Sequence, residues 1–542
     1  MKKVICFVLG ATLAVAAGAQ TWQDALLFSE NNYSGTARGV GMGNALTAIG
    51  GDAGSLTFNP AGSAVASYSQ FEITPGVTFS LAQVGAADGM TYMADKRNTF
   101  FGAAKLPNVG FIINMNSGRR SGLKRMSFGF VVNSTNNFTG RFNASGVNDD
   151  NSYAASLASS ADGFSSDVLG NEDWFYSGDP ARMPAWVDMT GYRAGMFNSV
   201  AGRDGAYVAL TEIVDSEGNF RLAGPLFQEY GQQTRGSKHD ILLNYAMNFS
   251  DKFYIGANLG VTVLRYALSE YWSERPENPA DFPIIQYSDG ATAQFESLRM
   301  KRNYRLDGNG VYFKIGALWR PVAGLRIGAA VQTPTMLNLR ERYGYSGESV
   351  LSGRYSGSAS SPEDDWIYAL RTPFRANVGV AYAMGNVAVI SADYEFVNYA
   401  SAAFRSRTSE NQYTVGSFSD VNQDIRDLLG AGHQLRLGTE VKVTPGVALR
   451  AGYNLITNGE RRTVLLKHNV SLGVGFSFGS FFLDAAVRGR FVPADYVIPY
   501  YYYYTPNPSQ FYYKDIDDSV LTPEVKVKSA MLDALLTIGW RF

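Results

Sequence analysis

Residues 37–62 read ARGVGMGNALTAIGGDAGSLTFNPAG, and this stretch decides how the rest of the chain must be organised. It is rich in Gly and Ala, which let two backbones approach closely. It ends in Asn59-Pro60-Ala61-Gly62, where proline fixes one backbone dihedral and glycine frees another. Such a segment cannot form a core of its own. We therefore expect this segment to be a plug, enclosed by a wall that the remaining chain builds.

The N-terminal residues predict export. Met1-Lys2-Lys3 precedes an apolar run from Val4 to Ala16, and Ala17-Gly18-Ala19 offers a small-residue cleavage site. The run falls short of the roughly 20 residues that a membrane helix needs, so we assign residues 1–19 to a signal peptide. The single cysteine, Cys6, lies inside that peptide. Its removal leaves no thiol for a disulfide, a metal–thiolate site or a cysteine nucleophile.

The charge balance and the residue composition of the chain indicate which class of protein it belongs to. The chain has 47 Lys+Arg and 48 Asp+Glu, and loss of Lys2 and Lys3 leaves 45 against 48, a net charge of -3. Such a balanced surface has no basic face for nucleic acid. With 32 Tyr, 33 Phe and 57 Gly and no long apolar run after the signal peptide, the sequence predicts an all-β protein with many turns.

The C-terminal residues indicate that these strands lie in lipid. One face of this strand is apolar: Leu532, Ala534, Leu536, Ile538, Trp540 and Phe542. The same two-residue alternation recurs over 464–478 and 374–384, with small or polar residues on the opposite face. Apolar side chains facing out and small or polar ones facing in are typical of a membrane barrel. A final strand that ends on an aromatic residue resembles the signal by which the barrel-assembly machinery recognises bacterial outer-membrane proteins.

The rhythm of turns gives the strand number. We expect about fourteen strands, near 71–80, 107–116, 125–138, 237–249, 252–270, 295–320, 324–341, 366–384, 386–404, 432–444, 446–457, 463–478, 480–491 and 524–542. Tight turns alternate with long connections, notably 139–236 and 492–523. Short periplasmic turns and long outer loops predict a transmembrane antiparallel β-barrel with both termini in the periplasm.

Three local features need a separate interpretation. We treat Asp307-Gly308-Asn309-Gly310 as a bulge or kink inside one long strand, because a hairpin there would make the strand number odd. We expect short helices within 140–236 that cap the barrel. The run Tyr500–Tyr504 has two readings, an aromatic girdle or loop packing, which we favour, and capture of a ligand.

The order of several short motifs along the chain is informative. They are Gly35-Thr36-Ala37-Arg38, the Gly/Ala run to Ala48, Asp52-Ala53, Asn59-Pro60-Ala61-Gly62, Leu325-Arg326-Ile327-Gly328, Gln332-Thr333-Pro334, Thr372-Pro373-Phe374-Arg375, Ser391-Ala392-Asp393-Tyr394 and Leu449-Arg450-Ala451-Gly452-Tyr453. In this order they resemble the FadL family of outer-membrane transporters for long-chain fatty acids and other hydrophobic compounds. The first four resemble that family's N-terminal hatch.

The resemblance implies a hatch at 20–68 inside a fourteen-stranded barrel at 69–542, in the outer membrane of a Gram-negative bacterium. It implies passive transport of a hydrophobic ligand, gated by the hatch, with Asp52, Asn59, Pro60, Ala61 and Gly62 as hatch and ligand-path residues. The loop at 140–236 is longer than in the best-known members, and some relatives serve secretion. The alternatives are therefore secretion, another hydrophobic cargo, or a general porin.

A kink in the third strand is also implied, because in the family this strand bends inward below the hatch. Here Asn133, Asn136 and Asn137 interrupt the apolar alternation that Phe128 and Phe130 begin. Polar side chains are costly against lipid. The strand either bends at this point or rises above the bilayer.

Enzymatic chemistry is not expected. The three histidines, His239, His433 and His468, have neither a serine elbow nor an acidic partner at useful spacing. Acidic clusters such as Asp149-Asp150 could bridge lipopolysaccharide, yet they lack the alternating spacing of a calcium loop. We expect no catalytic residue, no metal and no cofactor. The expected partners are the hydrophobic ligand, outer-membrane lipids with lipopolysaccharide, and the barrel-assembly machinery.

The terminal aromatic gives the first prediction. Deletion of Phe542 should lower the amount of folded outer-membrane protein, because its ring ends the outward-facing row of the last strand. Heat-modifiable migration of outer-membrane fractions measures the folded amount. Wild-type levels after the deletion would contradict this role.

Overall fold

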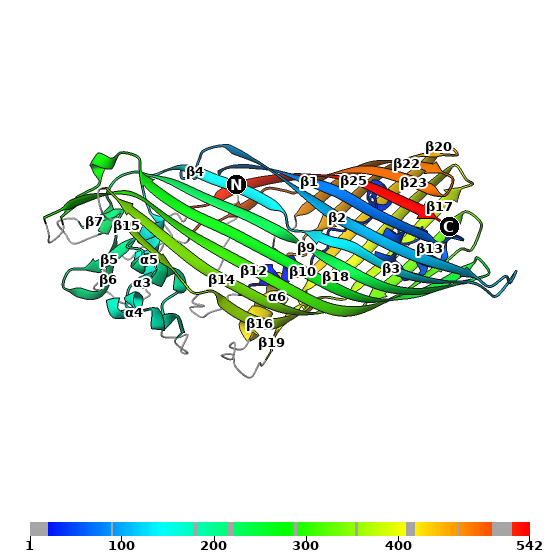
Figure 1. Cartoon of the computed structure of the whole chain (residues 1–542), viewed down its shortest axis with the longest axis horizontal. Coiled ribbons are helices and arrows are strands. Elements are labelled where there is room, and N and C mark those ends of the chain that lie inside the picture. Colours follow the sequence, from blue (N-terminus) through cyan, green and yellow to red (C-terminus); the bar gives the residue numbers. More distant parts are fainter. Residues whose placement is uncertain are drawn as a thin grey trace.

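A computed structural model describes residues 20–87, 90–176, 183–214, 220–286, 290–352, 356–407, 418–462, 465–500 and 523–542. The predicted signal peptide, 1–19, and the tyrosines after Tyr500 lie outside the described residues. Figure 1 shows an elongated barrel of oblique strands, with α3, α4 and α5 gathered at the end away from the C-terminus. None of the helices in the described ranges is long and apolar enough to span a membrane.

The wall is a closed antiparallel barrel with fourteen strand positions, as the turn rhythm predicts. In order, these positions are β1 (Gln70–Ala86), β2 (Arg97–Asn116), β3 (Leu123–Asn137) with β4 (Gly140–Asn148), β9 (Leu226–Phe249), β10 (Phe253–Pro276), β12 (Thr292–Trp319), β13 (Leu325–Gln332) with β14 (Met336–Leu351), β16 (Asp364–Arg371) with β17 (Arg375–Met384), β18 (Ala388–Asn398) with β19 (Ala403–Ser406), β20 (Ala431–Thr444), β21 (Val447–Thr457), β22 (Leu466–Phe478), β23 (Phe481–Phe491) and β25 (Val525–Arg541). Pairing of β25 with β1 closes the ring.

The remaining helices, turns and strands are shorter. The helices are α1 (Trp22–Ser29), α2 (Ala37–Gly41), α3 (Tyr153–Ala161), α4 (Ser166–Gly170), α5 (Trp186–Arg193) and α6 (Ser419–Leu428), with 3₁₀ turns η1 (Ala53–Thr57), η2 (Pro60–Ala64), η3 (Glu172–Tyr176), η5 (Pro279–Asp281) and η6 (Tyr399–Ser401). The remaining strands are β5 (Phe197–Val200), β6 (Arg203–Ala209), β7 (Glu212–Val214), β8 (Phe220–Leu222), β11 (Ile284–Gln286), β15 (Ser356–Ser360) and β24 (Asp495–Val497).

The predicted register is confirmed. Leu472 and Trp540 are 60% and 49% exposed on the outer surface, whereas Ser471, one residue before Leu472, and Thr537, three residues before Trp540, are buried. Phe542 exchanges backbone hydrogen bonds with Ser69, N–H to C=O in both directions at 3.0 Å. The outer face is therefore apolar where the inner face is polar, as a barrel in lipid requires.

Two predictions about strands on the long-loop side are wrong in detail. β9 begins at Leu226 and β10 continues to Pro276, so His239 lies within β9 rather than at its start. Strand hydrogen bonding in β9 and β10 continues beyond the apolar alternation, because these strands extend past the membrane level at which their outward face must be apolar. β12 is one strand, but it pairs residue for residue with β10 and β14 through Asp307–Gly310. No bulge interrupts it there.

The segment 20–66, here called the N-terminal segment, is largely buried inside this wall. Its small residues allow that. Gly43 has a φ of +61°, and a Cβ on Gly452 of β21 would lie 2.0 Å from the Gly43 nitrogen. Backbone therefore packs on backbone between the segment and the inner face of the barrel. The predicted short helices are present in the long connection between β4 and β9.

Candidate functional site

The Asn59 side chain forms hydrogen bonds with three backbone groups. Its amide nitrogen donates to the carbonyls of Thr47 and of Ala317 in β12, at 2.9 Å each, and its side-chain oxygen accepts from the N–H of Ala61 at 3.1 Å. The side chain thereby caps η2 and ties one turn of the N-terminal segment to another turn and to the wall. Asn59 is 1% exposed, so losing these bonds leaves buried backbone groups unpaired.

The rest of the motif is seated on two glycines of the wall. A Cβ on Gly316 would lie 2.1 Å from the Asn59 side-chain oxygen, and a Cβ on Gly256 would lie 2.6 Å from the carbonyl carbon of Pro60. Ala61 is fully buried, and the Gly62 carbonyl accepts from the N–H of Gly51 at 2.9 Å. This part of the N-terminal segment therefore rests directly against β10 and β12.

Asp52 lies on the opposite side of the segment. Its carboxylate accepts from the Thr36 hydroxyl at 2.8 Å and 3.0 Å, and that hydroxyl in turn accepts from the N–H of Gly39 and caps α2. Next to it, the N–H of Ala53 donates to Glu72 of β1 at 2.9 Å. Asp52 and Asn59 thus sit in one continuous hydrogen-bonded segment, but Asp52 bonds within the segment, whereas Asn59 also bonds the wall.

Charged side chains from the wall hold the N-terminal segment at two further places. The first centres on Glu440 of β20, which lies 3.0 Å from Arg38 and 2.7 Å from Arg450, while Arg450 also reaches Asp484 at 2.6 Å. Arg38 is the only member of this cluster from the N-terminal segment. Removing one partner of a buried ion pair leaves the other charge unpaired, at a cost of about 3–5 kcal/mol.

The second place centres on Glu395 of β18. It pairs with Arg375 at 2.7 Å and with Arg436, and it accepts from the Tyr33 hydroxyl at 3.1 Å. The Arg436 guanidinium lies over the rings of Tyr33 and Phe58, 5.2 Å and 4.7 Å from their centroids. The N-terminal segment therefore supplies a hydrogen bond to Glu395 and two aromatic faces to the fully buried Arg436.

Sequence reasoning did not select these charged residues. A signal was present, because Arg375, Glu395, Arg436, Glu440 and Asp484 all occupy the register opposite the lipid face of their strands. The alternation could not show which of these side chains meet across strands, or that Tyr33 and Arg38, far away in the sequence, contact them. The hatch and ligand-path residues, by contrast, were selected from the resemblance, and all of them lie in the N-terminal segment.

An apolar compartment lies inside the barrel next to α1. Its wall consists of inward-facing side chains from five strands: Leu264, Leu306, Leu337, Leu339, Tyr368, Leu370 and Phe404. Ala25, Leu26 and Phe28 of α1 and Ile425 of α6 pack against them. Glu341 lies at its edge and accepts from the hydroxyls of Tyr368 at 2.6 Å and Tyr304 at 3.1 Å. These side chains are buried against one another, so this part of the lumen is filled by apolar packing between α1 and the wall.

The wall is interrupted beside β3. β2 pairs with β3 only between Asn108 and Asn116, although β2 extends to Arg97 and β3 to Asn137. Beyond Asn133, the carbonyls of Ser134 and Thr135 accept instead from the N–H groups of Ser34 and Asn32, at 2.9 Å and 2.7 Å. A register shift against β9 lies between Ser134 and Asn136. β3 thus leaves β2 and pairs with the N-terminal segment.

The three asparagines of β3 fall at this point. Asn133 donates to Thr57 at 2.7 Å and accepts from Asn108 at 2.6 Å. Asn136 donates to the Glu30 carbonyl at 3.3 Å, and Asn137 donates to Thr78 of β1 at 3.1 Å. Asn133 and Asn136 are buried against the N-terminal segment, so neither amide is exposed to lipid.

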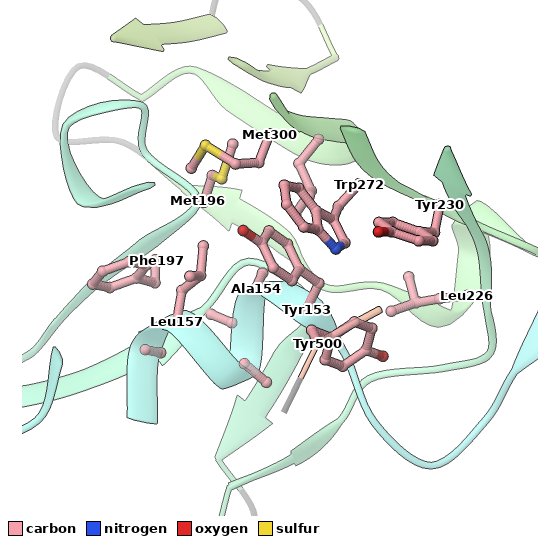
Figure 2. Packing of buried hydrophobic residues seen from close by; sticks show 14 of the residues in the cluster. Tyr153, Ala154, Leu157, Met196, Phe197, Leu226, Tyr230, Trp272, Met300 and Tyr500 are labelled. Atoms are coloured by element: carbon pink, nitrogen blue, oxygen red, sulfur yellow. The ribbon is translucent and has the colours of Figure 1, made fainter. Parts of the chain in front are cut away.

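A cap of helices and short strands lies over the long-loop end of the barrel. Figure 2 shows its contact with the wall, where Tyr153 of α3 stacks on Trp272 of β10, 5.2 Å between centroids, beside Tyr230 and Tyr500. The Trp272 indole donates to the Pro499 carbonyl at 2.5 Å. Tyr500 is thus part of the packing of this cap.

Buried carboxylates also fasten the cap. Glu274 of β10 accepts from the Ser152 hydroxyl at 2.8 Å and from the N–H of Tyr153 at 2.6 Å, at the start of α3. Asp188 of α5 accepts from Ser160 at 2.7 Å, while its second oxygen has no partner. Burial raises the pKa of Asp188 to about 7, and the hydrogen bond from Ser160 offsets this only in part. Asp188 therefore prefers its neutral form below that pH.

The histidines lie apart from this interior. His433 and His468 each contact a tyrosine hydroxyl, of Tyr394 at 2.7 Å and of Tyr453 at 2.8 Å. Across the described ranges, no group of three or more His, Cys, Asp or Glu side chains is placed to hold a metal ion.

Solved structures match this chain over nearly its whole length. A FadL homologue from Pseudomonas aeruginosa has 12% identity and a TM-score of 0.49, covering 94% of this chain and 99% of that one. The toluene transporter TbuX of Ralstonia pickettii has 12% identity and a TM-score of 0.45, covering 95% and 100%. TodX of P. putida, also a toluene transporter, has 12% identity and a TM-score of 0.46, covering 95% and 99%.

A FadL homologue is thus among the solved structures that this chain resembles. No family model matches the sequence, and no curated protein does. At these identities and TM-scores the likenesses assign neither a substrate nor a residue role. The function is therefore argued from the chain's own contacts.

The cap yields a prediction about pH. Because the folded pKa of Asp188 is about 7 against an ordinary value of 3.8, the docked cap binds the extra proton, and its stability falls as pH rises from about 4 to 7. Hydrogen exchange of α3 and α5, corrected for intrinsic rate, should lose about thirtyfold in protection between pH 5.5 and pH 8 through Asp188 alone. Asp188→Asn should reduce this dependence without abolishing it, because burial also raises the pKa of Asp162 and the pKa of Glu212 in the same cap to about 7. Asp167→Asn, on the exposed side of α4, should leave the dependence unchanged. Equal pH profiles for wild type and Asp188→Asn would contradict the assignment.

Proposed function

We propose that this chain carries long-chain fatty acids or similar hydrophobic molecules across the outer membrane of a Gram-negative bacterium. Movement is passive, and the N-terminal segment is the gate. The observation that carries the proposal is the apolar compartment inside the barrel, bounded by α1 and by inward-facing leucines of β10, β12 and β14. A water-filled pore needs a polar lumen, whereas an apolar ligand needs an apolar surface along its path.

The gate follows from how the segment is held. Its polar contacts are hydrogen bonds and ion pairs to side chains and backbone of the wall, such as Arg38 to Glu440 and Asn59 to the Ala317 carbonyl. Polar contacts of this kind are directional, so a shift of the segment breaks them together. We assign residues 20–68 to this hatch and 69–542 to the barrel, with 1–19 as the signal peptide removed on export.

The exit route proposed for the ligand is the interruption between β2 and β3. There the ladder stops at Asn108 and the N-terminal segment supplies the missing partners of β3. When the segment moves, Ser34 releases Ser134, and a path from the apolar compartment to the wall opens. Ligand that passes sideways enters lipid without crossing the polar pairs around Glu440.

Two other functions are less well supported. A general porin needs an open lumen, yet the N-terminal segment fills this one with buried contacts. Topology alone does not separate transport from secretion of another cargo, because fold does not determine cargo. The buried leucines favour a small hydrophobic cargo over a polypeptide. His433 and His468, each in contact with a tyrosine hydroxyl, support no enzymatic role.

The gate can be tested at Asn59 and Pro60. Asn59→Ala removes three bonds that hold the closed arrangement, each worth about 1 kcal/mol, so uptake of a labelled long-chain fatty acid by cells should rise at least threefold. Pro60→Ala should act in the same direction. Asn303→Ala and Pro334→Ala, at exposed positions on the outer wall, are matched controls and should leave uptake unchanged.

Folding is checked by heat-modifiable migration of each variant. Unchanged uptake in a normally folded Pro60→Ala barrel would contradict the gating role. Absence of fatty-acid uptake in the unmodified protein would instead redirect the proposal to another hydrophobic cargo or to secretion.

A further inference from the structure

The outward side chains of β9, β10, β12 and β14 change from apolar to basic at one level along the barrel axis. Towards the short turns, neighbouring outward side chains are apolar: Leu243, Leu259 and Phe313 in one row, then Val261, Val311 and Met336 in the next. Two rows further, Arg265, Asp307 and Arg340 are side by side, followed by Arg235, Arg305 and Arg342, and then by Lys301 and Arg299. A basic array therefore follows the apolar belt directly.

The depth of this array can be estimated. Arg265 lies twelve residues along β10 from Phe253 at the short-turn end. With a rise of about 3.3 Å per residue and a strand tilt of about 40°, this corresponds to about 30 Å along the barrel axis. The apolar band of such barrels is about 25 Å tall. The arginines therefore lie at the level of the head groups of the outer leaflet.

Internal partners neutralise only part of the array. Arg342 pairs with Asp307 at 3.0 Å, Arg340 pairs with Asp365, and Arg299 lies over the ring of Tyr271, 4.5 Å from its centroid. Within the described part of the chain, no ion pair joins Arg265, Arg305 or Lys301 to a carboxylate. The whole chain is nearly neutral, with 47 Lys+Arg against 48 Asp+Glu, so this excess of positive charge is local.

A groove of about 590 Å³ is set into the lower edge of the array. Arg265, Arg340 and Arg407 line it together with Asp307, Val263, Ile367, Asn309 and Asn338. All three arginines are exposed, and the one carboxylate in the lining, Asp307, is paired with Arg342 outside it. Cationic heads thus meet small amide and apolar surfaces in one depression, at the boundary between the apolar rows and the polar rows.

We propose that this groove binds the phosphorylated head group of a lipid in the outer leaflet. Guanidinium groups match phosphate oxygens through paired N–H donors and hold a fixed charge. Val263 and the rows below it face the acyl chains, while Asn309 and Asn338 can donate to hydroxyls or carbonyls of the head group. The proposal depends on the barrel being in the membrane, and it is independent of what the lumen carries.

The test uses the purified full-length protein in neutral detergent and three probes: diphosphoryl lipid A, its dephosphorylated form, and inorganic phosphate. We expect diphosphoryl lipid A to bind in a salt-dependent manner and the dephosphorylated form to bind at least tenfold more weakly. The variant Arg265→Gln/Arg340→Gln/Arg407→Gln should lose at least tenfold in affinity for diphosphoryl lipid A.

A matched control removes the same charge from the opposite rim. Arg119, Arg120 and Lys252 are exposed near the short turns, so Arg119→Gln/Arg120→Gln/Lys252→Gln should bind like wild type. Heat-modifiable migration confirms that both variants are folded. Equal binding by the groove variant and wild type, or equal losses in both variants, would overturn the site. Inorganic phosphate binding as tightly as the lipid would overturn the lipid as its occupant.

Discussion

The structure depends on one constraint: in lipid, every backbone N–H and C=O must find a partner within the protein. The ring of fourteen strand positions meets this constraint by closing β25 on β1, where fifteen residues of β1 are matched from Gln70–Arg541 to Ala86–Val525. An open edge at that seam would leave a row of unpaired groups in the bilayer. Outward Leu, Val and Phe side chains and inward polar ones follow from the same closure.

The interruption between β2 and β3 is therefore informative. The carbonyls of Ser134 and Thr135 still have partners, but these come from Ser34 and Asn32 of the N-terminal segment. These hydrogen bonds of β3 are lost when the N-terminal segment moves. The same segment also completes the environments of Arg436 and Glu440 inside the barrel. The proposed gate and the wall therefore share hydrogen bonds and ion pairs.

The alternation along β22 and β25 was sufficient to predict the barrel, its register and its strand number, because a two-residue period and turn lengths are local properties. It failed at β9 and at Asp307–Gly310, where hydrogen bonding continues although the outward face turns polar. Asn59 and Asp52 were selected by resemblance, and their actual partners, Ala317 and Thr36, were not predictable from spacing. Glu395 and Glu440 bind side chains of neighbouring strands and also Tyr33 and Arg38 of the N-terminal segment, far away in the sequence. The pattern within a single strand does not identify such partners.

The most direct test of the account is to fasten the segment to β3. Ser34 and Ser134 form an antiparallel bridge, a geometry in which Cα atoms lie about 4.5–5.5 Å apart and a disulfide fits. In Ser34→Cys/Ser134→Cys cells, uptake of labelled fatty acid should fall at least tenfold on oxidation and recover on reduction, while Ser34→Cys alone should show no redox effect. Uptake that is unchanged when the disulfide is fully formed would contradict a gate that opens by releasing β3.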